Sequence, residues 1–468
     1  MINSKLLQLF QALSAEDLRQ IQKMLKSPFF TANENLQTLF NLLRKQHPTF
    51  VEKAVQKEKI FAKVFPKHSY KELKLRNLMT DLVKIIEQYF IMAQLEKKVG
   101  LKEQLLSEHL LDKSELDLVD NSLKQFQNRL NKAPFQDEHF LYLQYESLKI
   151  RKKALLSRDP MMGAKLVSDL RRTLYDFYQL SDLKLVIELK SISGFSNVSE
   201  DRNIASSLQT NISYLLYRDV SVLLENNDLS LYYTIKEKLF QNLPEISPMV
   251  QIEIFSLLLN FVVKQMNKDD KQFNHIAFHL YQSAIENDLL LHKTAMVESH
   301  FYNIVLVSAK EKEFDWITEF MESHQEYLDD TTKTELLVIS QACLFFYKME
   351  YSNTIDSLLD HSFQVSSFEN IARNYLIKCY YELFVQDRSY FDLLKSQTQS
   401  YEKFTRRNKN LSEVIKDSQI KFIKFIRNLG QARRMGILPQ KEKENLLNKL
   451  EEEKYITSRS WLIEKLES

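Results

Sequence analysis

The chain is short of the residues that make tight turns. Its 468 residues include 5 glycines and 8 prolines, whereas average usage corresponds to about 33 glycines in a chain of this length. Sheets rely on glycine for turns with positive φ, and phosphate-binding loops rely on it where backbone approaches a ligand. The scarcity excludes a sheet-rich fold and predicts an all-α protein.

Motifs for several kinds of chemistry are also missing. Neither G-x-G-x-x-G nor G-x-x-x-x-G-K-[ST] occurs, which excludes the usual phosphate cradles. There is no G-x-S-x-G, no H-E-x-x-H and no paired C-x-x-C. We therefore predict no catalytic residues, no metal and no cofactor, and we do not expect an enzyme. A catalytic site assembled from dispersed residues is the alternative that one sequence leaves open.

Cysteines and long apolar runs are few. The two cysteines, Cys343 and Cys379, lie on helical stripes that face a core, which predicts buried thiols in a reducing, cytoplasmic setting. The longest apolar stretches, such as 342–347, span about six residues, whereas a membrane-spanning helix needs about 20. We expect no membrane span and a cytoplasmic location.

The overall charge is balanced, with 64 basic and 62 acidic residues. This balance implies no global attraction to nucleic acid or to a membrane, so any such contact would need a local patch. Hydrophobic residues make up 44% of the chain, which is enough to bury large cores.

Residues 1–98 are predicted to form an N-terminal helical domain. Ser14 and Asp17 can cap one helix, and Ser69 with Glu72 forms a capping box ahead of a helix of about 28 residues. Gly100 is a plausible stop for that long helix. With its Ser-Pro-Phe-Phe segment at 27–30, this region resembles helical proteins of the Bacteroidota, a resemblance that implies no activity.

The rest of the chain divides into three further predicted regions. The first is a helical middle region, 99–214, with a serine-rich connection near 191–203 that gives way to a helix near Ile204. The others are a set of helical repeats at 215–400 and basic C-terminal helices at 401–468 that cap them.

The helical repeats predicted at 215–400 follow from a regular spacing of aromatic residues. The aromatic residues Phe314, Tyr351 and Tyr390 are 37 and 39 residues apart, a period typical of stacked helix pairs. The spacing predicts a right-handed α-solenoid of such pairs behind the N-terminal helical domain.

The segment from 342 to 355 resembles the middle of a tetratricopeptide repeat. Ala342 matches the small residue of the first helix, Tyr351 the aromatic that opens the second helix, and Thr354 the small residue three positions later. The resemblance covers roughly 290–400. The usual glycine before the aromatic and the closing proline are absent, and the period exceeds 34. The resemblance implies an architecture of helix pairs and carries over no ligand-binding residues.

The C-terminal region contains a basic amphipathic segment. Ten basic residues lie between 403 and 434, opposed by Glu413 and Asp417. Seven apolar residues share the other side: Leu411, Val414, Ile415, Phe422, Phe425, Ile426 and Leu429. The candidate basic contact surface consists of Arg406, Arg407, Lys421, Lys424, Arg427, Arg433 and Arg434. Such a segment can contact nucleic acid, an anionic membrane or a partner groove. It can equally be the lysine-rich outer face of the last solenoid helices.

Other charged and histidine clusters favour ordinary surface roles. His275 and His279 share a helix face without a third ligand at a known spacing, so we interpret them as surface or partly buried histidines. The acidic pairs at 269–270 and 329–330 fall in predicted turns. The acidic stretch 311–335 is predicted to be a solvated face, or else a contact for a basic partner or for the basic end of this chain.

Two functions follow from this pattern. The first is a non-enzymatic scaffold or adaptor that binds a protein or peptide partner on a helical-repeat surface. The second is a nucleic-acid-associated protein that contacts phosphates through the basic C-terminal helices.

Overall fold

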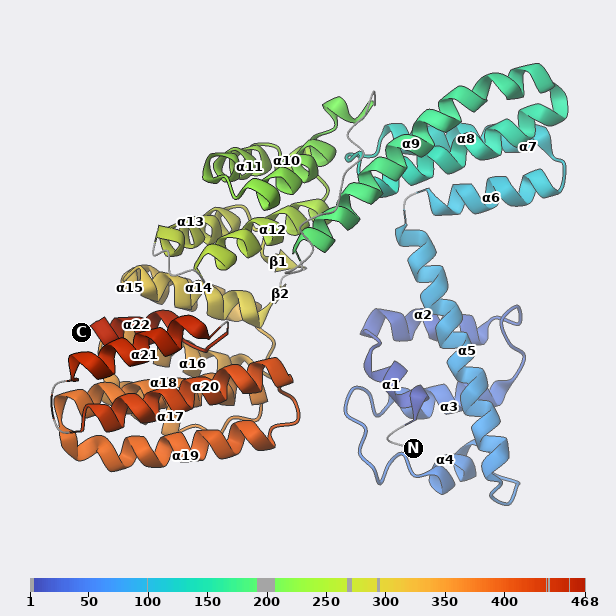
Figure 1. Cartoon of the computed structure of the whole chain (residues 1–468). Coiled ribbons are helices and arrows are strands. Elements are labelled where there is room, and N and C mark those ends of the chain that lie inside the picture. The colour runs from blue at the N-terminus through green and yellow to red at the C-terminus, as the bar shows by residue number, and fades with distance from the viewer. Residues whose placement is uncertain are drawn as a thin grey trace. The chain divides into compact units, whose positions relative to one another are not determined.

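The computed structural model describes residues 4–98, 100–191, 207–266, 272–292, 295–434, 436, 438–453 and 455–467. Within these ranges lie 22 α-helices, which confirms the prediction of an all-α protein. The strands described are β1 (Leu291–His292) and β2 (Ala295–Met296), which pair antiparallel. Figure 1 shows this succession of helices along the chain.

The chain divides into two compact units. Unit 1 comprises residues 1–133 and 139–175, and unit 2 comprises 134–138 and 176–468. The four domains predicted from the sequence are a finer division, and their boundaries stay predictions. The helix bounds up to the end of α9 are α1 (Lys5–Gln11), α2 (Ala15–Lys26), α3 (Glu34–Arg44), α4 (Lys57–Val64), α5 (Glu72–Lys97), α6 (Leu101–Asp112), α7 (Leu116–Asn131), α8 (Glu138–Arg158) and α9 (Pro160–Ser191).

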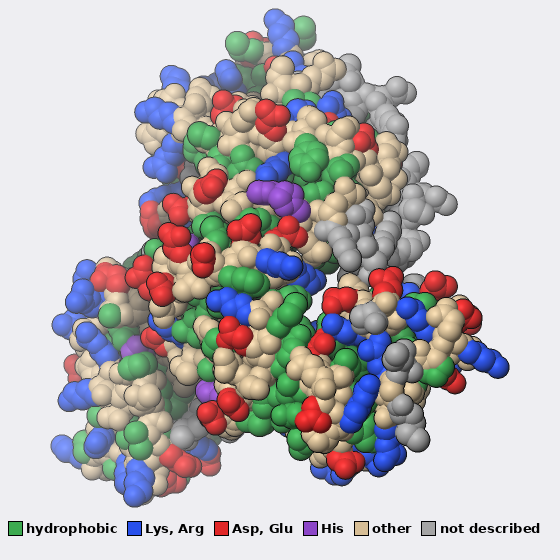
Figure 2. Space-filling view, turned by 90° about the vertical axis from the view of Figure 1, so that its left-hand side faces the viewer, with side chains coloured by type: hydrophobic (Ala, Val, Ile, Leu, Met, Phe, Trp, Pro, Cys, Tyr) green, Lys and Arg blue, Asp and Glu red, His purple; other side chains and the backbone are tan. Residues whose placement is uncertain are grey.

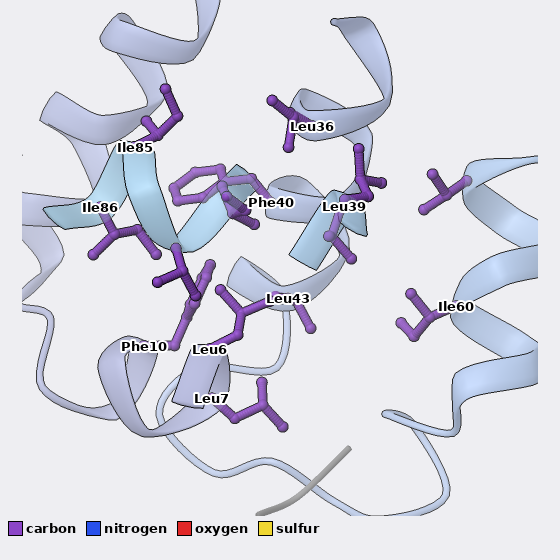
Figure 3. Close-up of a cluster of buried hydrophobic side chains, with 14 of the residues drawn as sticks. Leu6, Leu7, Phe10, Leu36, Leu39, Phe40, Leu43, Ile60, Ile85 and Ile86 are labelled. Atoms are coloured by element: carbon purple, nitrogen blue, oxygen red, sulfur yellow. The ribbon is translucent and has the colours of Figure 1, made fainter. Parts of the chain in front are cut away.

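The first five helices of unit 1 enclose a hydrocarbon core. Helices α1, α2, α3 and α4 each pack against α5, and Figure 3 shows the side chains that fill the space between them. The rings of Phe10 and Phe40 lie 5.5 Å apart, and both are fully buried, as are Leu43 and Ile86. Burying side chains of this size stabilises a fold by roughly 1.5–3 kcal/mol each.

Local capping explains where two of these helices begin. Ser14 Oγ accepts a hydrogen bond from the Asp17 amide at 3.1 Å, and the Asp17 carboxylate accepts from the Ser14 amide at 2.8 Å. This is the predicted capping box of α2. The box predicted from Ser69 was wrong. Helix α5 begins at Glu72, whose carboxylate binds the Lys57 ammonium, and its N-cap residue Lys71 makes no side-chain cap hydrogen bond.

Gly100 was predicted to stop the long helix, but α5 already ends at Lys97 with Lys98 as its C-cap, and Gly100 is the N-cap residue of α6. Its φ is +82°, and an added Cβ would lie 2.8 Å from Cε2 of Phe126. Only glycine fits both the left-handed backbone and this close approach.

Unit 2 contains the remaining helices. Their bounds are α10 (Ile212–Asn226), α11 (Leu229–Gln241), α12 (Pro248–Met266), α13 (Gln272–Glu286), α14 (Glu298–Lys310), α15 (Phe314–His324), α16 (Lys333–Tyr347), α17 (Tyr351–Leu359), α18 (Ser366–Gln386), α19 (Phe391–Arg407), α20 (Glu413–Ala432), α21 (Gln440–Glu452) and α22 (Arg459–Glu467). The predicted helix start near Ile204 and the acidic pair at 269–270 lie outside the described residues.

Helices of unit 2 pack both in sequence and in alternation. Each of α14, α16 and α18 packs against the helix that follows it, and α16 also packs against α14 and α18. In Figure 1 these helices form successive layers, coloured from yellow to orange-red. The buried Glu335 of α16 accepts from the backbone amides of Gln364 (2.9 Å) and Val365 (3.1 Å). This carboxylate therefore ties α16 to the start of α18.

Two turns 37 residues apart have the same backbone. Lys312, between α14 and α15, has φ 65°, and Met349, between α16 and α17, has φ 64°. The amide of the next residue reaches five residues back in both turns, Glu313 to the Ser308 carbonyl and Glu350 to the Phe345 carbonyl. A non-glycine residue thus takes the left-handed conformation that glycine favours. The third aromatic, Tyr390, lies in a 3₁₀ turn (Arg388–Tyr390) instead.

By length and composition alone, α12 is the one described helix that passes the criteria for a membrane span. It also packs against α10, α11 and α13 with side chains such as Ile254 and Leu258, which are fully buried. Core helices of compact units pass the same criteria.

Candidate functional site

Several residues of the predicted basic contact surface are bound by carboxylates of this chain. Two of its members share one acceptor, since Arg406 and Arg427 each place a guanidinium nitrogen 2.8 Å from the Glu402 carboxylate. These hydrogen bonds lower the pKa of Glu402. Lys421 is held by Asp417 and Glu453, both at 2.8 Å.

The other four residues have different surroundings. Arg433 is buried and donates to the carbonyl of Lys465 at 2.7 Å, while the Arg434 guanidinium lies 4.9 Å from the centre of the Phe391 ring. Arg407 and Lys424 are exposed and have no ion pair within the described part of the chain. On the face drawn in Figure 2, basic and acidic side chains are likewise interspersed.

Helix α20 has an amphipathic face, with one correction to its predicted extent. Phe422, Phe425 and Leu429 are buried as the pattern predicts. Val414 and Ile415 were assigned to the same buried side, but they are 67% and 45% exposed. They lie in the first turn of α20, so the buried stripe begins only further along the helix.

A second cluster of side chains lies on α14, α16 and α18, and we call it the α14–α18 face. Its members are Tyr302, Cys343, Phe346, Tyr375, Lys378 and Glu382. The hydroxyls of Tyr302 on α14 and Tyr375 on α18 are 3.1 Å apart, although α16 packs between these helices. The buried Cys343 of α16 lies beside Tyr375. Side chains of the first and third helices therefore meet beside the second.

Lys378 is the most unusual residue of the α14–α18 face. Its side chain is buried on α18, with its ammonium 5.8 Å from the Phe346 ring centre, 5.5 Å from that of Tyr375 and 5.7 Å from that of Trp461. Burial lowers the pKa of Lys378 to about 8, and the nearby Lys310 adds to this effect. Aromatic faces attract the cation and partly compensate its lost hydration.

The C-terminal helix α22 lies on the same face. Trp461 Nε1 donates to Oε1 of Glu382 on α18 at 3.1 Å, and the Lys465 ammonium lies 2.8 Å from the same oxygen. Leu462 and Leu466 of α22 are fully buried. Burial, together with the nearby charge of Glu382, raises the pKa of Tyr351 on α17.

Sequence reasoning missed α22, Lys378 and Glu382. A signal for α22 was available, because Leu462 and Leu466 are spaced i, i+4 and Trp461 is one of two tryptophans in the chain. Lys378 and Glu382 carry no such signal, since a lysine and a glutamate one turn apart are ordinary on any exposed helix face.

The cysteines and histidines match their predicted ordinary roles. Cys343 and Cys379 are buried free thiols, and burial raises the pKa of each to about 12, which makes them poor nucleophiles. His275 and His279 are exposed, with their Nε2 atoms 2.9 Å apart, and Glu311 contacts Nδ1 of His275. Among the described residues, no group of three or more His, Cys, Asp or Glu side chains is arranged to hold a metal ion.

The acidic stretch lies mostly at the surface. Glu313, Asp315, Glu319 and Glu322, on and just before α15, are exposed. Asp329 accepts from the Thr331 amide at 2.8 Å, a hydrogen bond that stabilises the predicted turn before α16.

Comparison of the chain with protein-family models, with curated proteins and with solved structures finds no match. The tetratricopeptide and Bacteroidota resemblances stay predictions.

Proposed function

We propose that this chain is a non-enzymatic interaction protein that binds a helix of a partner protein on the α14–α18 face. The architecture we propose for this part of unit 2 is a right-handed solenoid of helix pairs. It is supported by the alternate packing of α14, α16 and α18, by the matching turns at Lys312 and Met349, and by the hydroxyl contact between Tyr302 and Tyr375. Solenoids of this kind offer a concave surface to an extended partner.

The observation that carries the proposal is the way in which α22 is bound. The short helix α22 contacts this face through Trp461 and Lys465, which bind Glu382, and its Leu462 and Leu466 are buried. This combination is how grooves recognise helices, and tryptophan is enriched among residues that dominate binding energies. A partner helix would therefore carry an aromatic residue at one position and a lysine four residues later.

The nucleic-acid alternative has less support. Arg406, Lys421 and Arg427 bind carboxylates of this chain, and Arg433 is buried. Each of these side chains would have to leave its partner before it could contact phosphate.

Binding in trans tests the proposed face. A chain that ends at residue 453 lacks α22, and a labelled peptide of residues 455–468 supplies it. We expect saturable one-to-one binding by fluorescence anisotropy, weakened at least tenfold by Trp461→Ala in the peptide or by Glu382→Gln in the shortened chain. Ser460→Ala is the matched control, because Ser460 is exposed, and it should leave the affinity unchanged.

A functional partner must depend on the same contacts. We expect affinity purification with the shortened chain to retain a protein that is lost with Glu382→Gln and displaced by the α22 peptide. If the shortened chain keeps its helical circular dichroism but binds neither the peptide nor any Glu382-dependent protein, the proposal fails.

A further inference from the structure

A pocket opens between the start of α18 and the end of α19. It has a volume of about 530 Å³, within the roughly 300–1,000 Å³ typical of small-molecule sites. Its lining residues are Ser366, Arg373, Ser400, Lys403, Phe404, Arg407 and Asn408. None of the side chains that hold α22 lines it, so the pocket is separate from the proposed helix-binding contacts.

The charge of the pocket is positive. Arg373, Lys403 and Arg407 line it, and no carboxylate does. Arg373 is paired with Glu369 at 2.7 Å, whereas Lys403 and Arg407 are exposed and form no ion pair among the residues that the structure describes. The nearby Glu402 is already engaged by Arg406 and Arg427. Two cations therefore face the pocket without a counter-charge from this chain.

The polar groups of the pocket are arranged as donors. Asn408 Nδ2 donates to Ser366 Oγ at 2.5 Å, and the Arg373 guanidinium donates to Ser400 Oγ at 3.2 Å. Each hydroxyl oxygen is thus used as an acceptor, which leaves its own proton for another partner. Asn408 is held in this orientation because its Oδ1 accepts from the Asn410 amide at 2.9 Å.

One wall of the pocket combines the Phe404 ring with the Arg373 guanidinium. The Arg373 guanidinium lies 4.6 Å from the centre of the Phe404 ring, and its two hydrogen bonds to Glu369 fix it there. Ser366 is also the first residue of α18, so the positive end of that helix dipole adds to the local field. A ligand with an anionic head and a small organic body would match both halves of the lining.

We infer that this pocket binds a phosphate monoester. Two unpaired cations and two hydroxyl donors match a tetrahedral dianion with several acceptor oxygens, and a planar monoanionic carboxylate would use only part of this set. The group attached to the phosphate would lie against Phe404. Two sources present this chemistry, a phosphorylated side chain of a partner protein and a small phosphorylated metabolite.

The experiment is a calorimetric titration of the full chain with O-phosphoserine, with inorganic phosphate as the minimal probe. We expect saturable binding of O-phosphoserine, reduced at least tenfold by Arg407→Gln and about threefold by Ser400→Ala. Arg406→Gln is the matched control. It removes the same charge from the neighbouring residue, whose side chain is bound to Glu402 and does not line the pocket. It should change the affinity less than twofold.

Two further probes distinguish a phosphorylated protein from a phosphorylated metabolite as the ligand. Tighter binding of a phosphoserine hexapeptide than of glucose 6-phosphate identifies a phosphorylated protein, and the reverse order identifies a metabolite. The inference is overturned if no probe binds at 10-fold excess over millimolar protein, or if Arg406→Gln and Arg407→Gln weaken binding equally. It is also overturned if a single-stranded oligonucleotide binds more tightly than every monoester probe, because that would indicate general phosphate attraction.

Discussion

The core of α1–α5 and the α14–α18 face differ in the kind of side chain that they bury. In the first, the buried side chains are hydrocarbon, and ion pairs such as Lys5–Glu87 stay exposed at the surface. In the second, α18 buries Lys378 and Glu382 beside tyrosine and tryptophan rings. Burying a charge lowers stability unless partners compensate it. The first region therefore gains stability from apolar burial, and the second retains buried polar groups, of which Glu382 contacts α22.

The largest effect is expected in the hydrocarbon core. Phe40→Ala removes a fully buried ring from contact with Phe10, and it should lower the free energy of unfolding by about 3–5 kcal/mol. Urea titration, with hydrogen exchange measured on peptides of α1–α5, would locate the loss. Phe29→Ala is the control, since Phe29 is 88% exposed. Equal effects of the two substitutions would break the comparison.

Replacing the buried cation Lys378 should raise the free energy of unfolding instead of lowering it. The pKa of Lys378 is about 8 in the folded chain and about 10.4 when unfolded. Below pH 8 both states carry the proton, and the folded state bears the full cost of its charge. Lys378→Met removes this cost, and we expect the variant to be about 2 kcal/mol more stable than the parent at pH 7.

The advantage of Lys378→Met should then shrink as pH rises from 8 to 10, because the folded parent loses its proton before the unfolded chain does. Lys310, Cys343, Cys379 and Glu382 lie near the Lys378 ammonium. Chemical denaturation across this range gives the measurement. Lys348→Met, at an exposed lysine, should show no such trend, and a constant advantage for Lys378→Met would contradict the burial argument.

The smallest effects concern left-handed backbone in the two units. Gly100→Ala forces a Cβ to within 2.8 Å of the Phe126 ring at φ +82°, and it should destabilise unit 1 by about 1–2 kcal/mol. Met349→Gly relieves a side chain at φ 64° in unit 2, and it should stabilise that turn by about 0.5–1 kcal/mol. Thermal unfolding of both variants tests the pair. Shifts of the same sign would show that local conformation does not decide these positions.

Helix class and several helix ends could be predicted from the sequence because they depend on local chemistry. The capping box at Ser14 involves a neighbour three residues away, whereas the close approach at Gly100 is to Phe126, far along the chain. The start of α5 was misplaced because Glu72 binds Lys57, a residue 15 positions away that competes with the cap.

The positive charge of the basic surface was overestimated for a related reason. The window from 403 to 434 excludes Glu402 by one residue and Glu453 by a longer distance, and these carboxylates bind Arg406, Arg427 and Lys421. A charge count along the chain does not include acids that the fold brings in from outside the window. The surroundings of Lys378 depend on contacts among α14, α16, α18 and α22, which no local pattern encodes.

The attachment of α22 has a consequence for how that helix would come off. Trp461 and Lys465 both bind Oε1 of Glu382, so the two polar contacts share one atom instead of being spread along the helix. Protonating or redirecting that single carboxylate would weaken both contacts together. A competing helix that bears its own lysine could take this carboxylate, and the hydrogen bond from Arg433 to the Lys465 carbonyl would then be among the polar contacts left to hold α22.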